Sequence, residues 1–255
     1  MKKRSLPNVL QEGQVVNRAW LYDKGFDRPA VDFYLRSGRL VAVGRGYYRR
    51  PGPPLKWQHV LYSLTELGFD IHIGGHSALE HRGVTHYVSA GNQVNFYGCD
   101  SLPQWCQKVT TNSELSYRGR GGFPCGDSVG IDAVPFGTWE WQLPVSAPER
   151  ALLETLVSVT DTSDFHAIDK LFESAVSLRP KTVQAVLEAA KNVKAKRLFC
   201  WYSERHSHSW FNHVSVDKVD FGSGKRQIVP QGRLNNRYQI TVPIDMEAPD
   251  EESLY

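Results

Sequence analysis

Three prolines within four residues, Pro51-Gly52-Pro53-Pro54, interrupt this chain of 255 residues near its amino end. Proline has no backbone N–H and its ring clashes with the preceding helical turn, so this segment continues neither a helix nor a strand ladder. The chain is also longer than one typical domain. We therefore expect a small domain over residues 1–54 and a larger domain over residues 55–244, with a bridging helix over 55–67.

The residues before this boundary predict two short helices joined by a tight turn. Apolar residues at helical spacing over 15–21 predict the first helix, and Gly25 ends it. Asp27 is a candidate N-cap for the second helix, which tolerates Pro29 in its first turn and ends at Gly38. Two short helices with this connection form a candidate helix-turn-helix.

A hairpin is predicted directly after the second helix. The β-branched and apolar residues 40–43 predict one strand, glycines on both sides of Arg45 predict a turn, and residues 47–50 predict the returning strand. A helix-turn-helix followed by such a hairpin, with an arginine at its tip, predicts a winged helix.

Charge is distributed unevenly along the chain. Residues 1–56 contain 12 Lys and Arg against 4 Asp and Glu, a net charge of +8, whereas the rest contains 18 against 23, a net charge of −5. A segment this basic favours a polyanionic partner, because each neutralised phosphate releases counterions. The alternative is a solvated charged surface, which is the usual role of exposed arginines.

The predicted second helix offers a surface for such a partner. Arg28, Asp32 and Arg36 recur every four residues, opposite an apolar face, and this polar stripe suits a DNA groove. Together with the wing, the residues predicted to contact DNA are Arg28, Asp32, Arg36, Arg39, Arg45, Tyr47, Arg49 and Arg50.

The larger domain is predicted to combine a sheet with helices, so that the fold class is α+β. Short apolar runs interrupted by Gly, Pro and Asn over residues 70–143 predict an irregular, mostly antiparallel sheet with a short helix at 77–81. Later helices are predicted to open at Pro148 and to span about 163–178, 181–191 and 193–205. Loops and short strands such as 238–242 follow, and the acidic tail 245–255 is expected to be disordered.

Five segments between about Leu6 and Val242 carry a family resemblance. They are Arg45-Gly46-Tyr47-Tyr48, Gly74-Gly75-His76-Ser77-Ala78-Leu79-Glu80, Ser146-Ala147-Pro148-Glu149-Arg150-Ala151-Leu152-Leu153-Glu154, Val193-Lys194-Ala195-Lys196-Arg197-Leu198-Phe199 and Gly222-Ser223-Gly224-Lys225-Arg226. In this order they resemble the AbiEi family, the antitoxins and transcriptional regulators of abortive-infection (type IV) toxin–antitoxin operons.

The resemblance implies an N-terminal winged helix that binds promoter DNA and represses its own operon. It also implies a C-terminal domain that counteracts a nucleotidyltransferase-like toxin without forming a stable complex with it. The expected partners are therefore double-stranded operator DNA and this toxin. Base contacts of the second helix do not follow from the family pattern, so the operator sequence stays open.

The alternative class is a nucleic-acid-processing enzyme or an interaction protein that acts through the C-terminal domain. His206, His208 and His213, which follow Cys200, lack the paired short spacing of a zinc site. The segment 222–226 resembles a phosphate loop, but no serine or threonine follows its lysine to bind Mg²⁺. We therefore expect no catalytic residue, no metal site and no cofactor.

A basic cluster interrupts the otherwise acidic C-terminal region. Six basic residues and one acidic residue lie between Arg179 and Arg197. One hypothesis is that they form a positive surface that competes for the polyanionic target of the toxin. The alternative is that they only solubilise helices whose other faces pack. The candidate residues for antitoxicity are Lys191, Lys194, Lys196 and Arg197.

Location is inferred from the absence of two patterns. No run of eighteen apolar residues occurs, and the basic start over residues 1–4 is not followed by an apolar segment. We expect a soluble, cytoplasmic protein with no membrane partner. For a chain without an export signal, four irregularly spaced cysteines predict reduced thiols rather than a disulfide framework.

Overall fold

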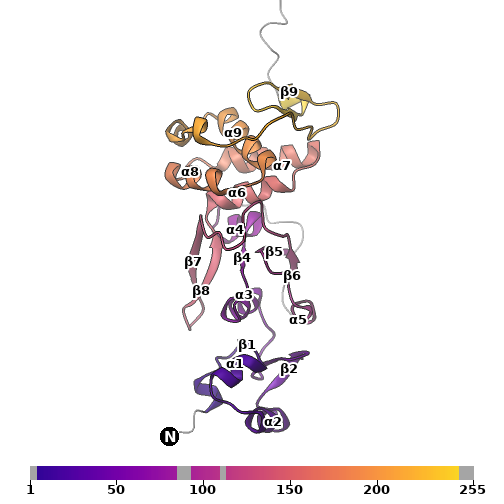
Figure 1. Ribbon diagram of the computed structural model, residues 1–255, viewed down its shortest axis with the longest axis vertical. Helices are drawn as coiled ribbons and strands as arrows, with labels where there is room; N and C mark the ends of the chain where they lie inside the picture. The colour runs from indigo at the N-terminus through magenta and orange to yellow at the C-terminus, as the bar shows by residue number, and fades with distance from the viewer. Residues whose placement is uncertain (1–4, 85–92, 110–112, 247–255) are drawn as a thin grey trace, which may run out of the picture. The chain divides into compact units, whose positions relative to one another are not determined.

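The computed structural model describes residues 5–84, 93–109 and 113–246 (Figure 1). The protein is α+β, as predicted, with a small N-terminal sheet, a mixed five-stranded sheet and C-terminal helices. Contacts group the chain into two compact units, each assembled from separate stretches. The first contains residues 1–73, 89–119 and 132–145, and the second contains residues 74–88, 120–131 and 146–255. The predicted domain boundary after residue 54 stays a prediction.

Residues 6–49 form a winged helix. Its three-stranded antiparallel sheet has the order β1-β3-β2, and the chain runs through strand, helix, helix, strand and strand. A 3₁₀ helix, η1, precedes them. The elements are η1 (Leu6–Asn8), β1 (Val15–Asn17), α1 (Arg18–Asp23), α2 (Arg28–Arg36), β2 (Val41–Gly44) and β3 (Tyr47–Arg49). The predicted winged helix is therefore confirmed.

The predicted first helix is wrong at its start. Residues 15–17 form β1, which pairs with β3, and α1 begins only at Arg18. Both valines of β1 are fully buried, and β-branched side chains favour a strand where one face packs in a core. The side chain of Asn17 then caps α1 by accepting a hydrogen bond from the backbone N–H of Trp20 at 2.8 Å.

The second helix agrees with its prediction because its signals are local. The carboxylate of Asp27 accepts a hydrogen bond from the backbone N–H of Ala30 at 2.9 Å, and Pro29 lies in the first turn. On the apolar face of the helix, Val31 is fully buried in the core of the winged helix. That core consists of Leu6, Leu10, Val16, Leu21, Phe26, Val31, Leu40 and Tyr48.

The hairpin between β2 and β3 requires both of its glycines. Gly46 has a φ of 80°, in the left-handed region that favours glycine. A Cβ on Gly44 would lie 2.6 Å from the Cβ of Trp105, so any side chain there would clash. Arg45, between the two glycines, is exposed at the tip of the wing. The predicted turn and its exposed arginine are confirmed.

The rest of the described first unit consists of the helices α3 and α5 and a five-stranded sheet of order β6-β5-β4-β8-β7. The bounds are α3 (Trp57–Glu66), β4 (Ile71–Ile73), β5 (Gln93–Gly98), α5 (Gln104–Lys108), β6 (Glu114–Tyr117), β7 (Ile131–Phe136) and β8 (Trp141–Ser146). The predicted bridging helix over 55–67 corresponds to α3. The hydroxyl of Ser63 in α3 accepts a hydrogen bond from the backbone N–H of Val15 in β1 at 2.8 Å.

The prediction of a mostly antiparallel sheet is wrong. Strands β4 and β5 are antiparallel, but β5 pairs with β6 and β4 pairs with β8 in parallel. Parallel neighbours need a crossover connection instead of a hairpin, and α5 lies in the connection from β5 to β6. Short alternating runs reveal that a segment is a strand, but they do not reveal the direction of its partner.

Two tryptophans of the first unit contact the winged helix. The ring of Trp105 in α5 packs on Tyr47 of β3 with ring centroids 5.6 Å apart. The indole N–H of Trp141 in β8 donates to the side-chain oxygen of Gln11, and its ring stacks on Tyr62 of α3 with centroids 4.0 Å apart. The winged helix is thus joined to residues that lie far beyond the proline segment.

The second unit is mainly helical, as the sequence predicts. Its helices match the expected positions to within a few residues, and Pro148 opens one of them. The bounds are α4 (Gly75–His81), α6 (Pro148–Val157), α7 (Thr162–Ser174), α8 (Pro180–Ala189), α9 (Val193–Arg205), η2 (Ser209–His213), η3 (Val216–Lys218), β9 (Arg233–Asn235), β10 (Ile240–Val242) and η4 (Ile244–Met246). From residue 247 onward, the predicted acidic tail lies outside the described residues.

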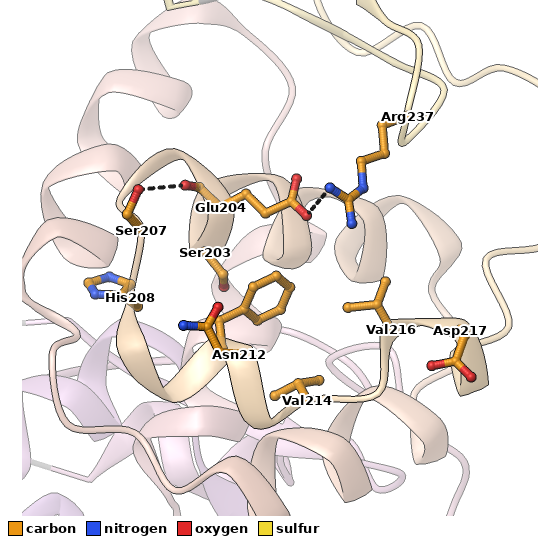
Figure 2. Close-up of a pocket in the computed structure, with 10 residues that line it drawn as sticks. Ser203, Glu204, Ser207, His208, Asn212, Val214, Val216, Asp217 and Arg237 are labelled. Carbon is orange, nitrogen blue, oxygen red and sulfur yellow. Dashed lines mark hydrogen bonds and ion pairs between the residues drawn. The ribbon is translucent and has the colours of Figure 1, made fainter.

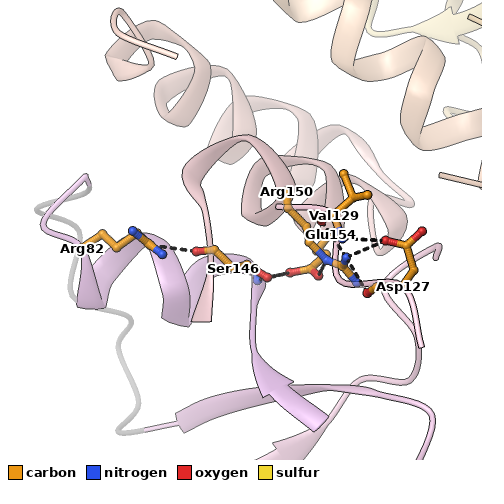
Figure 3. Close-up of polar contacts among 7 residues, drawn as sticks. Arg82, Asp127, Val129, Ser146, Arg150 and Glu154 are labelled. Carbon is orange, nitrogen blue, oxygen red and sulfur yellow. Dashed lines mark hydrogen bonds and ion pairs between the residues drawn. The ribbon is translucent and has the colours of Figure 1, made fainter. Parts of the chain in front are cut away.

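A buried ionic network lies in the second unit around α6 (Figure 3). The guanidinium of Arg150 donates to Glu154 at 2.9 Å and to the backbone carbonyls of Asp127 and Val129 at 3.0 and 2.8 Å. The other carboxylate oxygen of Glu154 accepts from the hydroxyl of Ser146 at 2.9 Å. Arg150 and Glu154 are only 2% and 1% exposed, so each charge depends on these partners.

Two expectations for the whole chain can be compared with the structure. Cys106 and Cys200 are free and buried. Among the described residues, no helix is both long enough and apolar enough to cross a membrane.

Candidate nucleic-acid interface

Helix α2 presents a polar face to solvent. Its buried face packs on the core through Val31, while Arg28 and Arg36 are exposed on the other side. The Arg28 side chain is 77% exposed. The Nε of Arg36 donates to the backbone carbonyl of Asp32 at 3.2 Å, which orients the guanidinium along the helix. Because both side chains are already exposed, they can contact a partner without any rearrangement of the core.

Asp32 lies between two arginines at the centre of this face. Its carboxylate is 3.8 Å from the Nε of Arg28 and 3.7 Å from a guanidinium nitrogen of Arg18 in α1. Arg18 also donates to the hydroxyl of Tyr48 in β3 at 3.3 Å. Arg18 thus links α1, α2 and the wing, a positioning role that the sequence analysis did not assign. Because the negative charge of Asp32 is balanced by these two arginines, it reduces the attraction of this face for phosphate less than an unpaired carboxylate would.

Two further predicted contact residues flank the helix. Arg39, just beyond α2, and Arg45, at the wing tip, are both exposed. Tyr47 is half-buried because its ring packs on Trp105. Of the predicted contact residues, the exposed cations are therefore Arg28, Arg36, Arg39 and Arg45, and we call these four residues the arginine face.

Arg49 and Arg50 have partners within the protein. The guanidinium of Arg49 donates to the backbone carbonyls of Pro53 and Gly52 at 2.7 and 3.0 Å. Arg50 donates to the carbonyl of Leu10 at 3.3 Å. Burial lowers the pKa of Arg49. These contacts hold the proline segment and the N-terminal loop in place, and DNA contact by either arginine stays a prediction.

Phe33 is an exposed aromatic residue on α2 that the sequence analysis did not include. It is 54% exposed, and its ring contacts the ring of Tyr34 edge-on, with centroids 5.7 Å apart. Neighbouring apolar residues of the helix pack on the core. Phe33 belongs neither to the apolar face nor to the charged stripe that the sequence pattern defines. Its position on the helix, away from the apolar face, was the signal that could have identified it.

Of the four candidate residues for antitoxicity in the C-terminal helices, three are buried or half-buried. Lys194 donates to the carbonyls of Val157 and Val159 at 2.8 and 2.7 Å, and burial lowers its pKa. Lys196 is 3% exposed, and burial lowers its pKa too. Lys191 is exposed.

Arg197, the fourth of these candidates, is 3% exposed. Its guanidinium donates to the backbone carbonyls of Phe221, Gly222, Gly224 and Gln239 at distances between 2.6 and 3.2 Å. The glycine-rich segment 222–226 therefore acts as an acceptor loop for Arg197 within the fold. The antitoxic role of the four residues stays a prediction, and the structure gives three of them a structural role.

The histidines considered for zinc have other contacts. A ring nitrogen of His206 is 2.8 Å from a carboxylate oxygen of Asp169, and one of His208 is 2.6 Å from the carbonyl of Phe172. Within residues 5–84, 93–109 and 113–246, no group of three or more His, Cys, Asp or Glu side chains is arranged to hold a metal ion.

A pocket of about 780 Å³ lies in the second unit beside α9 (Figure 2). A carboxylate oxygen of Glu204 is 2.8 Å from the guanidinium of Arg237 across part of it. Asp217 adds another carboxylate to the lining, so acidic groups outnumber arginine there. This balance disfavours a polyanion. The lining residues are Ser203, Glu204, Ser207, His208, Phe211, Asn212, Val214, Val216, Asp217 and Arg237.

Comparison with known proteins identifies two adjoining family matches. Residues 1–90 match the family described as "Transcriptional regulator, AbiEi antitoxin N-terminal domain". Residues 92–243 match the family described as "Transcriptional regulator, AbiEi antitoxin, Type IV TA system". No curated protein matches the chain.

The chain is also similar to a solved structure, the crystal structure of the RV2827C protein from Mycobacterium tuberculosis. The two are 14% identical with a TM-score of 0.51, over 90% of this chain and 86% of that chain. At this identity the similarity concerns the fold alone.

Proposed function

Because the chain belongs to the AbiEi family of transcriptional regulators and antitoxins of type IV toxin–antitoxin systems, we propose that its winged helix binds operator DNA and represses its own operon. The family is non-enzymatic, and membership implies DNA and a cognate toxin as partners. The identity of the operator, the class of the toxin and the residues that act on each belong to the proposal.

The arginine face is the observation that supports DNA binding most strongly. Arg28, Arg36, Arg39 and Arg45 are exposed on α2, directly after it and at the wing tip. In a winged helix, the second helix of the helix-turn-helix enters the major groove, and neighbouring cations contact phosphates. A guanidinium can pair with two phosphate oxygens or with the edge of guanine, so the same side chains serve affinity and readout.

Titration of the full chain against labelled DNA tests this function. The probe is a duplex that spans the DNA upstream of the gene, and a shuffled duplex of the same length and composition is the control. We expect the upstream duplex to bind at least 10³-fold more tightly at physiological salt, the lower end for specific recognition. Equal affinity for the two duplexes would contradict a role as an operator-binding repressor.

For the antitoxic activity, we propose the action that the family implies, against a nucleotidyltransferase-like toxin and without a stable complex. Co-expression with the toxin should restore growth, while the two purified proteins should elute separately in size-exclusion chromatography. Co-elution at micromolar concentration would contradict the absence of a complex. Failure to restore growth by a soluble, folded chain would contradict antitoxicity itself.

Lys191 is the one member of the predicted antitoxic set with an exposed side chain, and Lys181 at the start of α8 is also exposed. We therefore narrow the proposed polyanion-binding surface to these two lysines. A Lys181→Glu, Lys191→Glu variant should still repress its promoter but restore growth less well. Full rescue would remove this surface from the proposal. Charge reversal at Lys194 or Lys196 would be uninformative, because both side chains support the fold.

A further inference from the structure

The apolar face of α2 is complete without Phe33. Val31 is fully buried, and Ala30, Tyr34 and Leu35 pack against the same core. Phe33 points away from that core and remains 54% exposed. Its edge-on contact with Tyr34 restricts the ring. Phe33 therefore adds an apolar contact surface to α2 without taking part in the core.

The surroundings of Phe33 are cationic. Residues three and four positions apart are neighbours on a helix, so Pro29 and Arg36 flank Phe33 on the exposed side of α2. Arg28 and Asp32 lie further around the helix, where the carboxylate of Asp32 is paired with Arg28 and Arg18. An apolar ring within a positively charged surface is complementary to a partner that shows an apolar group among phosphates. The major groove of DNA has this composition.

We propose that Phe33 contacts the 5-methyl group of a thymine in the major groove and thereby determines part of the sequence preference. The inference rests on the proposed function, because it requires α2 to enter that groove. The thymine methyl is the apolar group that base pairs display there, and phenylalanine is among the side chains that contact it. The arginines supply affinity for phosphate or guanine, whereas Phe33 distinguishes thymine from cytosine.

Replacement of thymine by deoxyuridine tests this contact, because it removes the methyl group and leaves base pairing unchanged. The probe is a duplex that the wild-type full chain selects from a randomised library, with its thymines replaced one at a time. We expect at least one replacement to weaken wild-type binding about fourfold, which corresponds to about 0.8 kcal/mol for one buried methyl-sized group. The Phe33→Ala and Phe33→Gln variants have lost the group that contacts the methyl. Each variant should therefore bind the thymine duplex and the deoxyuridine duplex with affinities that agree to within about 1.5-fold.

Tyr22→Ala is the matched control, because Tyr22 is an exposed aromatic residue on α1, at 43% exposure, and not on α2. This variant should retain the full fourfold deoxyuridine effect. The proposal is overturned if no thymine replacement weakens wild-type binding, or if both Phe33 variants keep the wild-type penalty. If the wild-type chain selects no preferred sequence, the proposed function fails and this inference fails with it. If the wild-type chain does select a sequence but the Phe33 variants keep the deoxyuridine penalty, only this inference fails and the proposed function stands.

Discussion

The exposed arginines of the winged helix and two arginines of the second unit, Arg150 and Arg197, have opposite environments. Arg28, Arg36 and Arg45 are exposed to solvent, and their guanidinium groups can exchange water for phosphate at little cost. Arg150 and Arg197 are buried, and each donates to several oxygen atoms of its own chain. The difference shows that a count of basic residues does not identify a binding surface. Burial and internal acceptors separate a binding arginine from a structural one.

The largest loss of stability is expected for a substitution at Arg150. Arg150→Met leaves Glu154 as a buried charge with fewer partners, and breaking such a pair costs about 3–5 kcal/mol of unfolding free energy. Urea denaturation followed by circular dichroism measures this loss. The matched control is Arg36→Met, an exposed position that should change stability by about 0.5 kcal/mol or less. Comparable losses in the two variants would contradict the distinction.

Arg197→Ala should have the next largest effect. It removes the donor to four backbone carbonyls and should cost about 2–3 kcal/mol, with faster amide exchange over residues 221–242. Arg197→Lys keeps the charge but cannot make the forked contacts, so it should recover only part of the loss. Hydrogen exchange read by mass spectrometry checks both variants. Unchanged exchange in this segment for Arg197→Ala would show that the contacts are unimportant for its order.

The pair of Glu149 and Arg179 predicts a dependence on pH. Burial raises the pKa of Glu149, but hydrogen bonds from Arg179 more than offset this, so the pKa is lower than usual. A lowered carboxyl pKa stabilises the fold above the unfolded pKa, about 4.3, and this stabilisation is lost as pH falls through the folded value.

Glu149→Gln should therefore be less stable than wild type by about 1–2 kcal/mol at pH 7. Because the side chain of Arg179 is 56% exposed, we expect the lower end of this range. The difference should shrink as pH falls below about 4.3. Denaturation curves of both proteins from pH 7 to pH 3 provide the measurement. A constant difference over this range would assign the loss to packing instead of ionisation.

The smallest expected effect is that of Arg45→Ala, which should leave stability unchanged and weaken DNA binding severalfold. Loss of one phosphate contact should lower the salt slope by about 0.9. Arg49→Ala is the paired comparison, because Arg49 donates to the carbonyls of Pro53 and Gly52. We expect that variant to lower the melting temperature more than it changes the salt slope. The opposite result would place Arg49 on the DNA and restore its predicted role.

Local signals made parts of the fold predictable. Asp27 and Pro29 mark the start of α2 within three residues of chain, and the glycines beside Arg45 mark the wing. By contrast, β1 depends on pairing with β3, about thirty residues later, and the parallel pairing of β4 with β8 depends on a still more distant partner. Sequence periodicity contains no information on such pairing.

The candidate site was predictable to a similar extent. The stripe Arg28, Asp32 and Arg36 was visible from its spacing, and its two arginines are exposed. The burial of Lys196 was not visible, because α9 is buried on most of its circumference and its pattern does not separate an inner from an outer face. Phe33 was missed because it lies in neither the apolar face nor the charged stripe of α2, so neither pattern included it.

The salt dependence of DNA binding tests the central claim most directly. One variant replaces Arg28, Arg36, Arg39 and Arg45 with alanine. A control of equal charge, the lysine variant, replaces the exposed residues Lys170, Lys218, Lys225 and Arg226 of the second unit. The plot of log affinity against log salt for the selected duplex should lose about 3–4 units of slope in the arginine variant, because each phosphate contact contributes about 0.9. The lysine variant should keep the wild-type slope. Equal slopes in the two variants would contradict DNA binding by the arginine face.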